Sequence, residues 1–195
     1  MKKAIITLAI TLGFMLSSQA QWEIKPMVGI NTSHLTTEHV NWSSEGRIGY
    51  QIGVGVLVGE KFYFEPGIYW NTTSSEIYNK ENADKFTFNH STSFIRIPVN
   101  IGYHILGNEE SLADLRFFAG PAVSFITGVK DDSGELSKDE FKSMLFDINA
   151  GLGVDVWIFF LEWNYVFGLT PVFKDGHSNS KDQIFYVNLG VRVKL

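Results

Sequence analysis

The chain contains no cysteine, which excludes a disulfide framework and any thiolate metal centre. Basic residues are also few, because 16 lysines and arginines stand against 21 aspartates and glutamates, for a net charge of −5. The concentrated basic surface that nucleic-acid binding requires is therefore not expected, and no nucleic-acid partner is predicted. Only five of the 195 residues are proline, and no Pro-, Ser- or charge-rich linker divides the chain. A single domain is expected after the N-terminal segment.

Long apolar runs are scarce, and the clearest one stands at the start of the chain. Lys2-Lys3 precede an apolar stretch of about 13 residues, Ala4–Leu16, which ends in small and polar residues. A membrane-spanning helix needs roughly 20 apolar residues, whereas a basic start, a short apolar run and a small-x-small ending are typical of a secretory signal peptide. We predict that residues 1–20 are a signal peptide and that residues 21–195 are the exported domain. An uncleaved anchor helix is the alternative, which mass spectrometry of the mature N-terminus distinguishes.

Beyond residue 21 the apolar residues recur with a period of two, which is typical of β-strands. In Ile95–Ile105 every second residue is apolar, and the residues between them include arginine, asparagine, glycine and histidine. The same division occurs in Phe146–Asp155 and Phe185–Leu195. No segment after the signal peptide has the periodicity of a convincing helix, so an all-β fold is expected.

Eight segments of this kind are predicted as strands, and each is long enough to cross a bilayer as a tilted strand of roughly 9 to 11 residues. They are residues 22–33, 46–58, 62–73, 92–106, 115–129, 145–156, 158–170 and 183–195. The links between them alternate in length: 34–45, 74–91, 130–144 and 171–182 are long and polar, whereas 59–61, 107–114 and the turn near Val156-Trp157 are short. This alternation is typical of barrels whose short turns face the periplasm and whose loops face outside. The sequence therefore predicts an eight-stranded antiparallel up-and-down transmembrane β-barrel in the bacterial outer membrane.

One face of these strands carries charges, amides and glycines, which a soluble lipocalin-like or sandwich fold would not combine in this way. Its charged and amide members are Glu23, Lys25, Arg47, Glu65, Arg96, Arg116, Asp147, Asp155, Glu162, Arg192, Lys194, Asn31, Gln51, Asn71, Asn100, Asn149, Asn164 and Asn188. Six positive and five negative charges nearly cancel. We expect this face to fill a narrow lumen with an ion-pair and amide network, with glycines relieving the crowding.

The opposite face is apolar, as expected of a surface that meets lipid, where a central Arg or Lys costs about 2 to 4 kcal/mol. Its members include Ile24, Val28, Ile30, Ile48, Tyr50, Ile52, Val54, Val56, Ile68, Trp70, Phe117, Val123, Phe125, Leu161, Trp163, Tyr165 and Phe167. Aromatic residues near strand ends are predicted to form girdles at the lipid headgroups. They are Trp22, Tyr50, Tyr63, Trp70, Tyr103, Trp157, Trp163 and Phe185.

Several short motifs spread over the exported domain carry a family resemblance. They are Ile24–Asn31, Phe64–Ile68, Ile97–Tyr103, Phe118–Pro121 and Gly151–Val154. With these motifs the sequence resembles the PorT-like outer-membrane β-barrel proteins (porin family) typical of Bacteroidota. The resemblance implies an outer-membrane location and a barrel architecture, and it transfers no catalytic residue. PorT itself is associated with a protein-secretion apparatus, so the resemblance also implies a secretion accessory.

Motifs that carry chemistry are few. The five histidines are His34, His39, His90, His104 and His177, and only His104 falls on a predicted strand, near its periplasmic end. No G-x-S-x-G elbow is present, and the acidic segment 131–140 does not have the alternating carboxylates of an EF-hand loop. No catalytic, cofactor-binding or metal residue is predicted, and the chain is not expected to be an enzyme. A barrel enzyme acting on lipid A, using His34 or His90, is the least favoured alternative.

Two classes of function remain open. The first is a structural or interaction barrel, whose external loops contact protein partners or surface components such as lipopolysaccharide. Lipid bilayer, the barrel assembly machinery and a secretion-complex or surface protein are the expected partners. The second is a small-solute channel, which an eight-stranded barrel disfavours because its side chains fill the interior.

Overall fold

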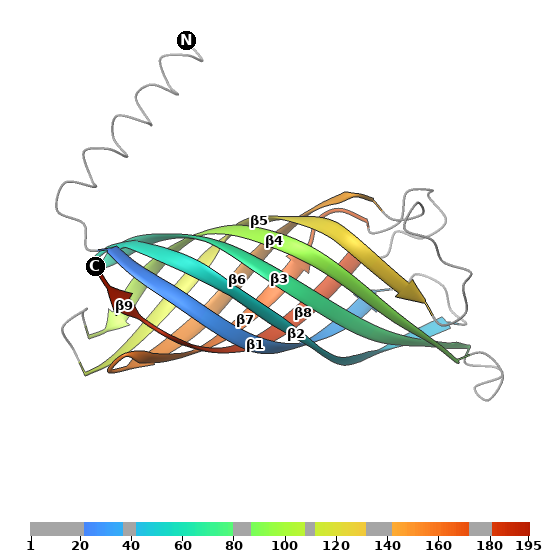
Figure 1. Cartoon of the computed structure of the whole chain (residues 1–195), viewed down its shortest axis with the longest axis horizontal. Coiled ribbons are helices and arrows are strands. Elements are labelled where there is room, and N and C mark those ends of the chain that lie inside the picture. Colours follow the sequence, from blue (N-terminus) through green and yellow to red (C-terminus); the bar gives the residue numbers. More distant parts are fainter. Residues whose placement is uncertain (1–21, 37–41, 80–86, 108–111, 132–141, 172–180) are drawn as a thin grey trace, which may run out of the picture.

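The computed structural model describes residues 22–36, 42–79, 87–107, 112–131, 142–171 and 181–195. Within them the chain forms one antiparallel sheet that closes on itself. The strands are β1 (Trp22–Thr36), β2 (Trp42–Gly59), β3 (Phe62–Asn79), β4 (Thr87–Leu106), β5 (Ala113–Asp131), β6 (Met144–Val156), β7 (Phe159–Gly168), β8 (Lys181–Val191) and β9 (Val193–Lys194). Figure 1 shows them tilted around a common axis. The described residues contain no helix long and apolar enough to cross a membrane.

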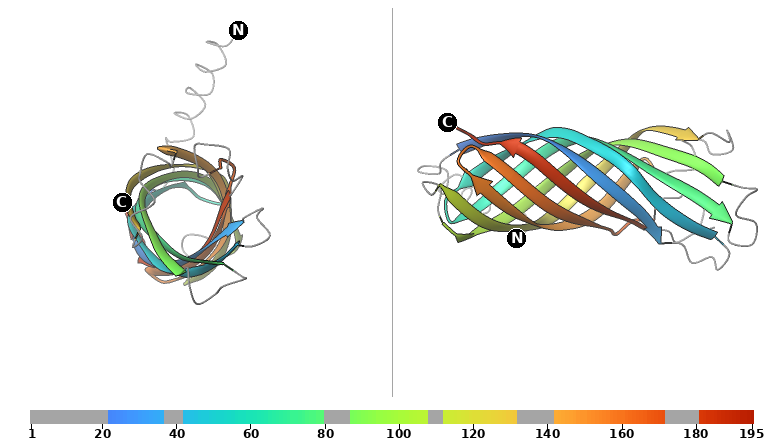
Figure 2. Two further views of the ribbon diagram at one scale, coloured as in Figure 1. Left: turned by 90° about the vertical axis from the view of Figure 1, so that its right-hand side faces the viewer. Right: turned by 90° about the horizontal axis from the view of Figure 1, so that it is seen from below.

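The sheet closes because the first strand pairs with both the second and the last. From β1 to β8 each strand is hydrogen-bonded to the next in the sequence, and β1 also pairs with β8. The short β9 continues β8 in the same register on β1, since Gly190 is opposite Met27 and Lys194 is opposite Glu23. β8 and β9 are therefore one strand interrupted at Arg192. The view along the axis shows a closed ring (Figure 2), which confirms the predicted eight-stranded antiparallel up-and-down barrel.

Five strands, β1 to β5, are longer than the sequence pattern indicates. β1 has 15 residues, β2 and β3 each have 18, β4 has 20 and β5 has 19, whereas β6, β7 and β8 have 13, 10 and 11. Most of the extra residues lie at the end opposite the C-terminus, in segments predicted to be loops; Gly59, Ala113 and Asp114 lie at the periplasmic end. The predicted first external link, 34–45, is thereby reduced to residues 37–41. Serine, threonine and asparagine continue the backbone pairing here without any apolar alternation to reveal it.

The outward face is apolar, as predicted. Outward residues such as Val28, Ile52 and Ile68 are 56%, 54% and 51% exposed, and so much exposed apolar surface suits only a lipid environment. At the periplasmic end Trp157 is the first residue of the two-residue link between β6 and β7. Its φ is 56° and its side chain is 68% exposed. A bulky residue rarely adopts this left-handed conformation. Its outward indole fits the predicted periplasmic aromatic girdle.

Two side chains do not lie where the sequence placed them. Tyr63, predicted in a girdle, is 3% exposed inside the lumen, because it lies two residues from Glu65 and so faces the same way. Arg47, predicted inside, is exposed, because a register shift between Arg47 and Tyr50 interrupts the alternation of β2. Lys194 lies on the predicted lumen face, opposite Glu23 and 3.8 Å from its carboxylate, but at the periplasmic rim, where its side chain is 46% exposed.

Candidate functional site

The centre of the lumen holds a network of buried charges. The Lys25 ammonium donates to Glu65 Oε2 at 2.8 Å and to Glu162 Oε1 at 2.7 Å. The Arg116 guanidinium donates to the same Glu162 oxygen at 2.6 Å and to Asp155 Oδ2 at 2.8 Å. All five side chains are at most 4% exposed. Because they come from β1, β3, β5, β6 and β7, the network crosses the lumen from wall to wall.

The network continues toward the periplasmic end through Arg192. Its Nε and Nη2 donate to the two carboxylate oxygens of Glu23 at 2.6 and 2.8 Å, while Nη1 donates to Asp155 Oδ2 at 2.6 Å. A fork of this kind holds a carboxylate in a defined orientation. Glu23 of β1 and Arg192, between β8 and β9, are thus tied to Asp155 of β6.

A separate polar group lies nearer the external end. Arg96 donates to Asp147 Oδ1 from Nη2 at 2.7 Å and from Nε at 3.2 Å, and Nη2 also donates to Asn149 Oδ1 at 2.8 Å. Asn149 in turn donates to Asn100 Oδ1 at 2.7 Å, and Ser124 donates to Asp147 Oδ2 at 3.1 Å. The predicted ion-pair and amide network is therefore confirmed in its main members.

The sequence analysis missed the aromatic part of the lumen. Tyr63 lies over Gly102, so that a Cβ on this glycine would come within 2.0 Å of the Tyr63 ring. The rings of Tyr63, Phe118 and Phe160 surround Arg116, with their centroids 5.6 to 6.0 Å from its guanidinium carbon. Besides Tyr63, three aromatic residues of the lumen have a glycine directly opposite them on a neighbouring strand. The pairs are Tyr69 with Gly53, Phe118 with Gly151 and Phe160 with Gly190.

Together these contacts make the lumen a packed interior rather than a pore. Charged groups bridge the walls, and rings lie where glycine leaves room on the adjacent strand. The interior has the character of a protein core built from polar and aromatic residues, as expected for a barrel of eight strands.

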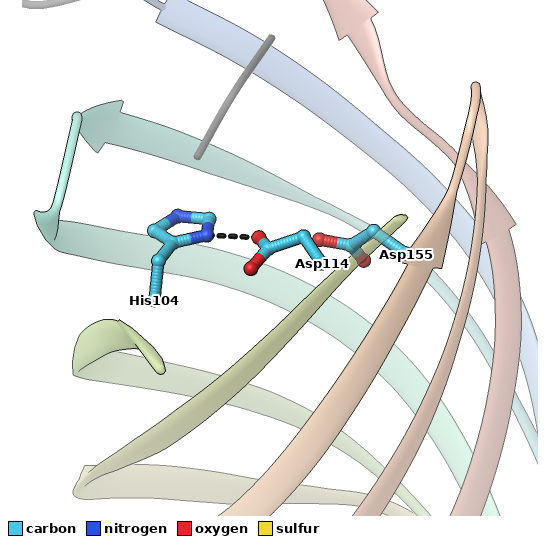
Figure 3. A group of neighbouring side chains, drawn as sticks. All are labelled: His104, Asp114 and Asp155. Atoms are coloured by element: carbon cyan, nitrogen blue, oxygen red, sulfur yellow. Dashed lines mark hydrogen bonds and ion pairs between the residues drawn. The ribbon is translucent and has the colours of Figure 1, made fainter. Parts of the chain in front are cut away.

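A second cluster lies at the periplasmic end of the lumen. His104 is on the lumen side of β4, as predicted, and it is fully buried. Its Nδ1 is hydrogen-bonded to Oδ2 of Asp114, the second residue of β5 (Figure 3). Asp155 of β6 is the third member, and one ligand atom from each residue lies within 4.8 Å of the others. The sequence analysis placed Asp114 in a turn, although it lies two residues before the lumen residue Arg116 and so faces the same way.

Asp114 also changes the balance of charge. Among the described residues, the buried cations are Lys25, Arg96, Arg116 and Arg192. The buried carboxylates are Glu23, Glu65, Asp114, Asp155, Glu162 and Asp147. The predicted near-balance of six positive and five negative charges does not hold for the buried side chains, since Arg47 is exposed, Lys194 lies at the solvent-exposed rim, and the carboxylate of Asp114 was missed. Among the buried side chains of the described residues, six carboxylates stand against four cations.

Other predicted features fall wholly or partly outside what the structure describes. The predicted signal peptide, His39, His177 and residues 132–140 of the acidic segment lie outside the described residues. His34 and His90 lie on β1 and β4, but their side chains are not among those described.

A closed antiparallel barrel with an apolar outer belt and a polar interior defines an outer-membrane β-barrel protein. Residues 17–174 match the family model described as "Outer membrane protein beta-barrel domain", and the chain belongs to this family. It is a protein of the bacterial outer membrane. A comparison with curated protein sequences found no match.

Solved structures with a similar fold are outer-membrane barrels of similar length. The chain is 12% identical to Neisserial surface protein A (NspA), with a TM-score of 0.53 and coverage of 89% of this chain and 97% of that one. It is 9% identical to Ail, the attachment invasion locus protein of Yersinia pestis, with a TM-score of 0.50 and coverage of 89% and 99%. At these identities the likeness shows the fold alone.

Proposed function

We propose that this protein is an interaction barrel, in which a rigid transmembrane wall holds an extracellular sheet that contacts a partner. The observation that carries the proposal is the length of β2 to β5. The "extracellular sheet" is defined here as residues 42–47 of β2, 74–79 of β3, 87–93 of β4 and 128–131 of β5. In Figure 2 these four strands extend past the others at one end of the barrel.

The outward residues of β3 indicate where the lipid ends. Trp70 is 46% exposed, and the next outward positions are Thr72 and Ser74. From residue 71 to Asn79 the strand continues for nine residues. At ~3.3 Å per residue and a tilt of about 45°, this length rises about 20 Å above the apolar belt. The extracellular sheet therefore stands clear of the membrane core.

The extracellular sheet separates from the rest of the barrel. Pairing of β1 with β2 ends at Thr32 and Ile48, whereas pairing of β2 with β3 continues to Trp42 and Asn79. On the other side, pairing of β5 with β6 ends at residues 125 and 144, while β4 and β5 stay paired to residues 90 and 131. Within the described residues, no strand pairing is present along the outer edge of residues 42–46 of β2 or of residues 128–131 of β5. Such edges are the features that bind an extended segment by strand addition.

The packed lumen supports an interaction role over a small-solute channel. A water-filled pore needs about twice as many strands, and charged and aromatic side chains occupy the interior here. The attachment invasion locus protein of Yersinia pestis, solved in complex with a heparin analogue, is a barrel of similar length whose name denotes attachment. On the resemblance to PorT-like proteins, we further propose that the partner is a component of a secretion complex. Lipopolysaccharide, the bilayer and the barrel assembly machinery complete the proposed contacts.

Site-specific photo-crosslinking in living cells tests the proposal. A photoreactive phenylalanine analogue at Ser74, in the extracellular sheet, is expected to give a discrete adduct. The same analogue at Lys61, in the periplasmic β2–β3 turn, is the matched control and is expected not to give that adduct. A variant with residues 75–90 replaced by a short Asn-Gly turn should keep heat-modifiable migration on SDS gels and lose the partner. If Ser74 gives no adduct and the purified barrel conducts ions stably, the proposal fails.

A further inference from the structure

The periplasmic cluster of His104, Asp114 and Asp155 combines three groups that commonly bind metals. Asp114 and Asp155 are directly opposite each other on β5 and β6, so both carboxylates face the lumen at the same level. Like charges in this position repel each other. His104 lies one strand away, and Figure 3 shows the Asp114 carboxylate between the imidazole and Asp155. The three side chains are at most 3% exposed.

The charges around this cluster do not balance. In the periplasmic half of the described lumen, five buried carboxylates face three buried cations. The carboxylates are Glu23, Glu65, Asp114, Asp155 and Glu162, and the cations are Lys25, Arg116 and Arg192. Lys194 lies 3.8 Å from Glu23, but solvent reaches nearly half of its side chain and weakens its effect. The excess of two negative charges equals the charge of one divalent cation.

Each residue of the cluster has a lone pair or a polar atom that the described contacts leave unused. Asp114 Oδ1 is buried and has no hydrogen-bond partner within the described part of the chain. His104 Nδ1 faces Asp114, and its other ring nitrogen, Nε2, is buried without a partner there and takes no part in the cluster. Asp155 Oδ2 accepts from both Arg116 and Arg192, whereas Oδ1 accepts only one contact of 3.1 Å from Arg116 Nε. A carboxylate has about four lone-pair sites, so Asp155 can keep both arginines and still bind an ion.

We propose that His104, Asp114 and Asp155 form a binding site for one divalent transition-metal ion of the Zn²⁺ or Mn²⁺ class. One imidazole and two carboxylates suit these ions, whereas Ca²⁺ and Mg²⁺ prefer oxygen ligands alone. The ion would take the place of the hydrogen bond between His104 Nδ1 and Asp114 Oδ2. It would fasten β4 and the start of β5 to β6 at the periplasmic end of the lumen.

Calorimetric titration with ZnCl₂ and with MnCl₂ tests this site. The protein carries no histidine tag, is treated with EDTA and is refolded into detergent micelles. The wild type is expected to bind one ion per chain, and Asp114→Asn, which keeps the shape but removes the charge, to bind at least 100-fold more weakly. His90→Asn is the matched control and is expected to bind as the wild type does. X-ray absorption of the zinc form should show only nitrogen and oxygen ligands at about 2.0 to 2.2 Å.

Two results would overturn the site. One is the absence of stoichiometric binding of either ion by the wild type, which would mean that the hydrogen bond between His104 and Asp114 holds the cluster together without an ion. The other is binding that survives Asp114→Asn but is lost in His90→Asn, which would place the ion in the external segments. Heat-modifiable migration shows whether each variant has folded. If Asp114→Asn does not fold, His104→Gln provides the same test.

Discussion

Replacing Arg96 with methionine tests whether the lumen is a packed interior or a solvated pore. Methionine keeps much of the length of arginine and removes its charge and donors. In the wild type the guanidinium makes three hydrogen bonds, two to Asp147 and one to Asn149. The side chains of Arg96 and Asp147 are 2% and 8% exposed. After the substitution the Asp147 carboxylate keeps Ser124 as a hydrogen-bond donor and has lost its counter-ion.

The expected loss of stability depends on the surroundings of this pair. In a water-filled pore an ion pair contributes about 0.2 to 1 kcal/mol. In a desolvated interior, removing one partner costs about 3 to 5 kcal/mol, because an uncompensated charge stays buried. The low exposure of both side chains places the pair in the second case. The double variant Arg96→Met/Asp147→Leu removes the stranded charge as well, and it is expected to cost less than Arg96→Met alone.

Reversible unfolding in urea, with the barrel in lipid vesicles, measures these free energies. The five tryptophans provide the fluorescence signal, and heat-modifiable migration confirms that each variant has folded. The difference between single and double variants gives the coupling between the two side chains. A loss below about 1 kcal/mol for Arg96→Met would show that water solvates the pair. The argument for a packed lumen would then be refuted.

Three further predictions concern the two faces of the wall. Ile68→Arg, in the apolar belt, should lower the free energy of unfolding by about 2 to 4 kcal/mol. Thr72→Arg, near the external rim, should lower it by about 0 to 1 kcal/mol. The same urea titrations measure both losses. Gly102→Val should cost about 1 to 3 kcal/mol, because Tyr63 already occupies the space, and adding Tyr63→Ala should recover part of that loss. In planar bilayers the wild type should show no stable conductance, and openings in the nanosiemens range would contradict the packed lumen.

The transmembrane part of the fold could be predicted because lipid and lumen impose opposite chemistries on alternate residues. In residues 95–105 every charged or amide residue stands between two apolar residues. The structure places the charged and amide residues inside the barrel and the apolar ones beside them outside. Strand number and order followed from the same alternation. The sequence also predicted most of the buried charges, because a charge can point only inward within the belt.

The aromatic half of the lumen could not be found in this way, because aromatic side chains suit both faces of such a wall. Tyr63 was assigned to a girdle on its position near a strand end. Its spacing from Glu65 would have placed it inside, and its fit depends on Gly102, its partner across β3 and β4. That pairing requires the register of neighbouring strands, which a single sequence does not provide. Asp114 was missed for a similar reason, since nearby charged residues made the segment look like a turn.

The extracellular sheet shows what the period-two pattern measures. Along β3 the outward apolar positions end at Trp70, although the strand continues to Asn79. Above the lipid an outward side chain meets water and has no reason to be apolar, so the alternation disappears while the backbone pairing goes on. The pattern therefore reports the thickness of the membrane rather than the length of the strand. The residues that the sequence could describe only as polar links include most of the extracellular sheet, which the proposed function assigns to partner binding.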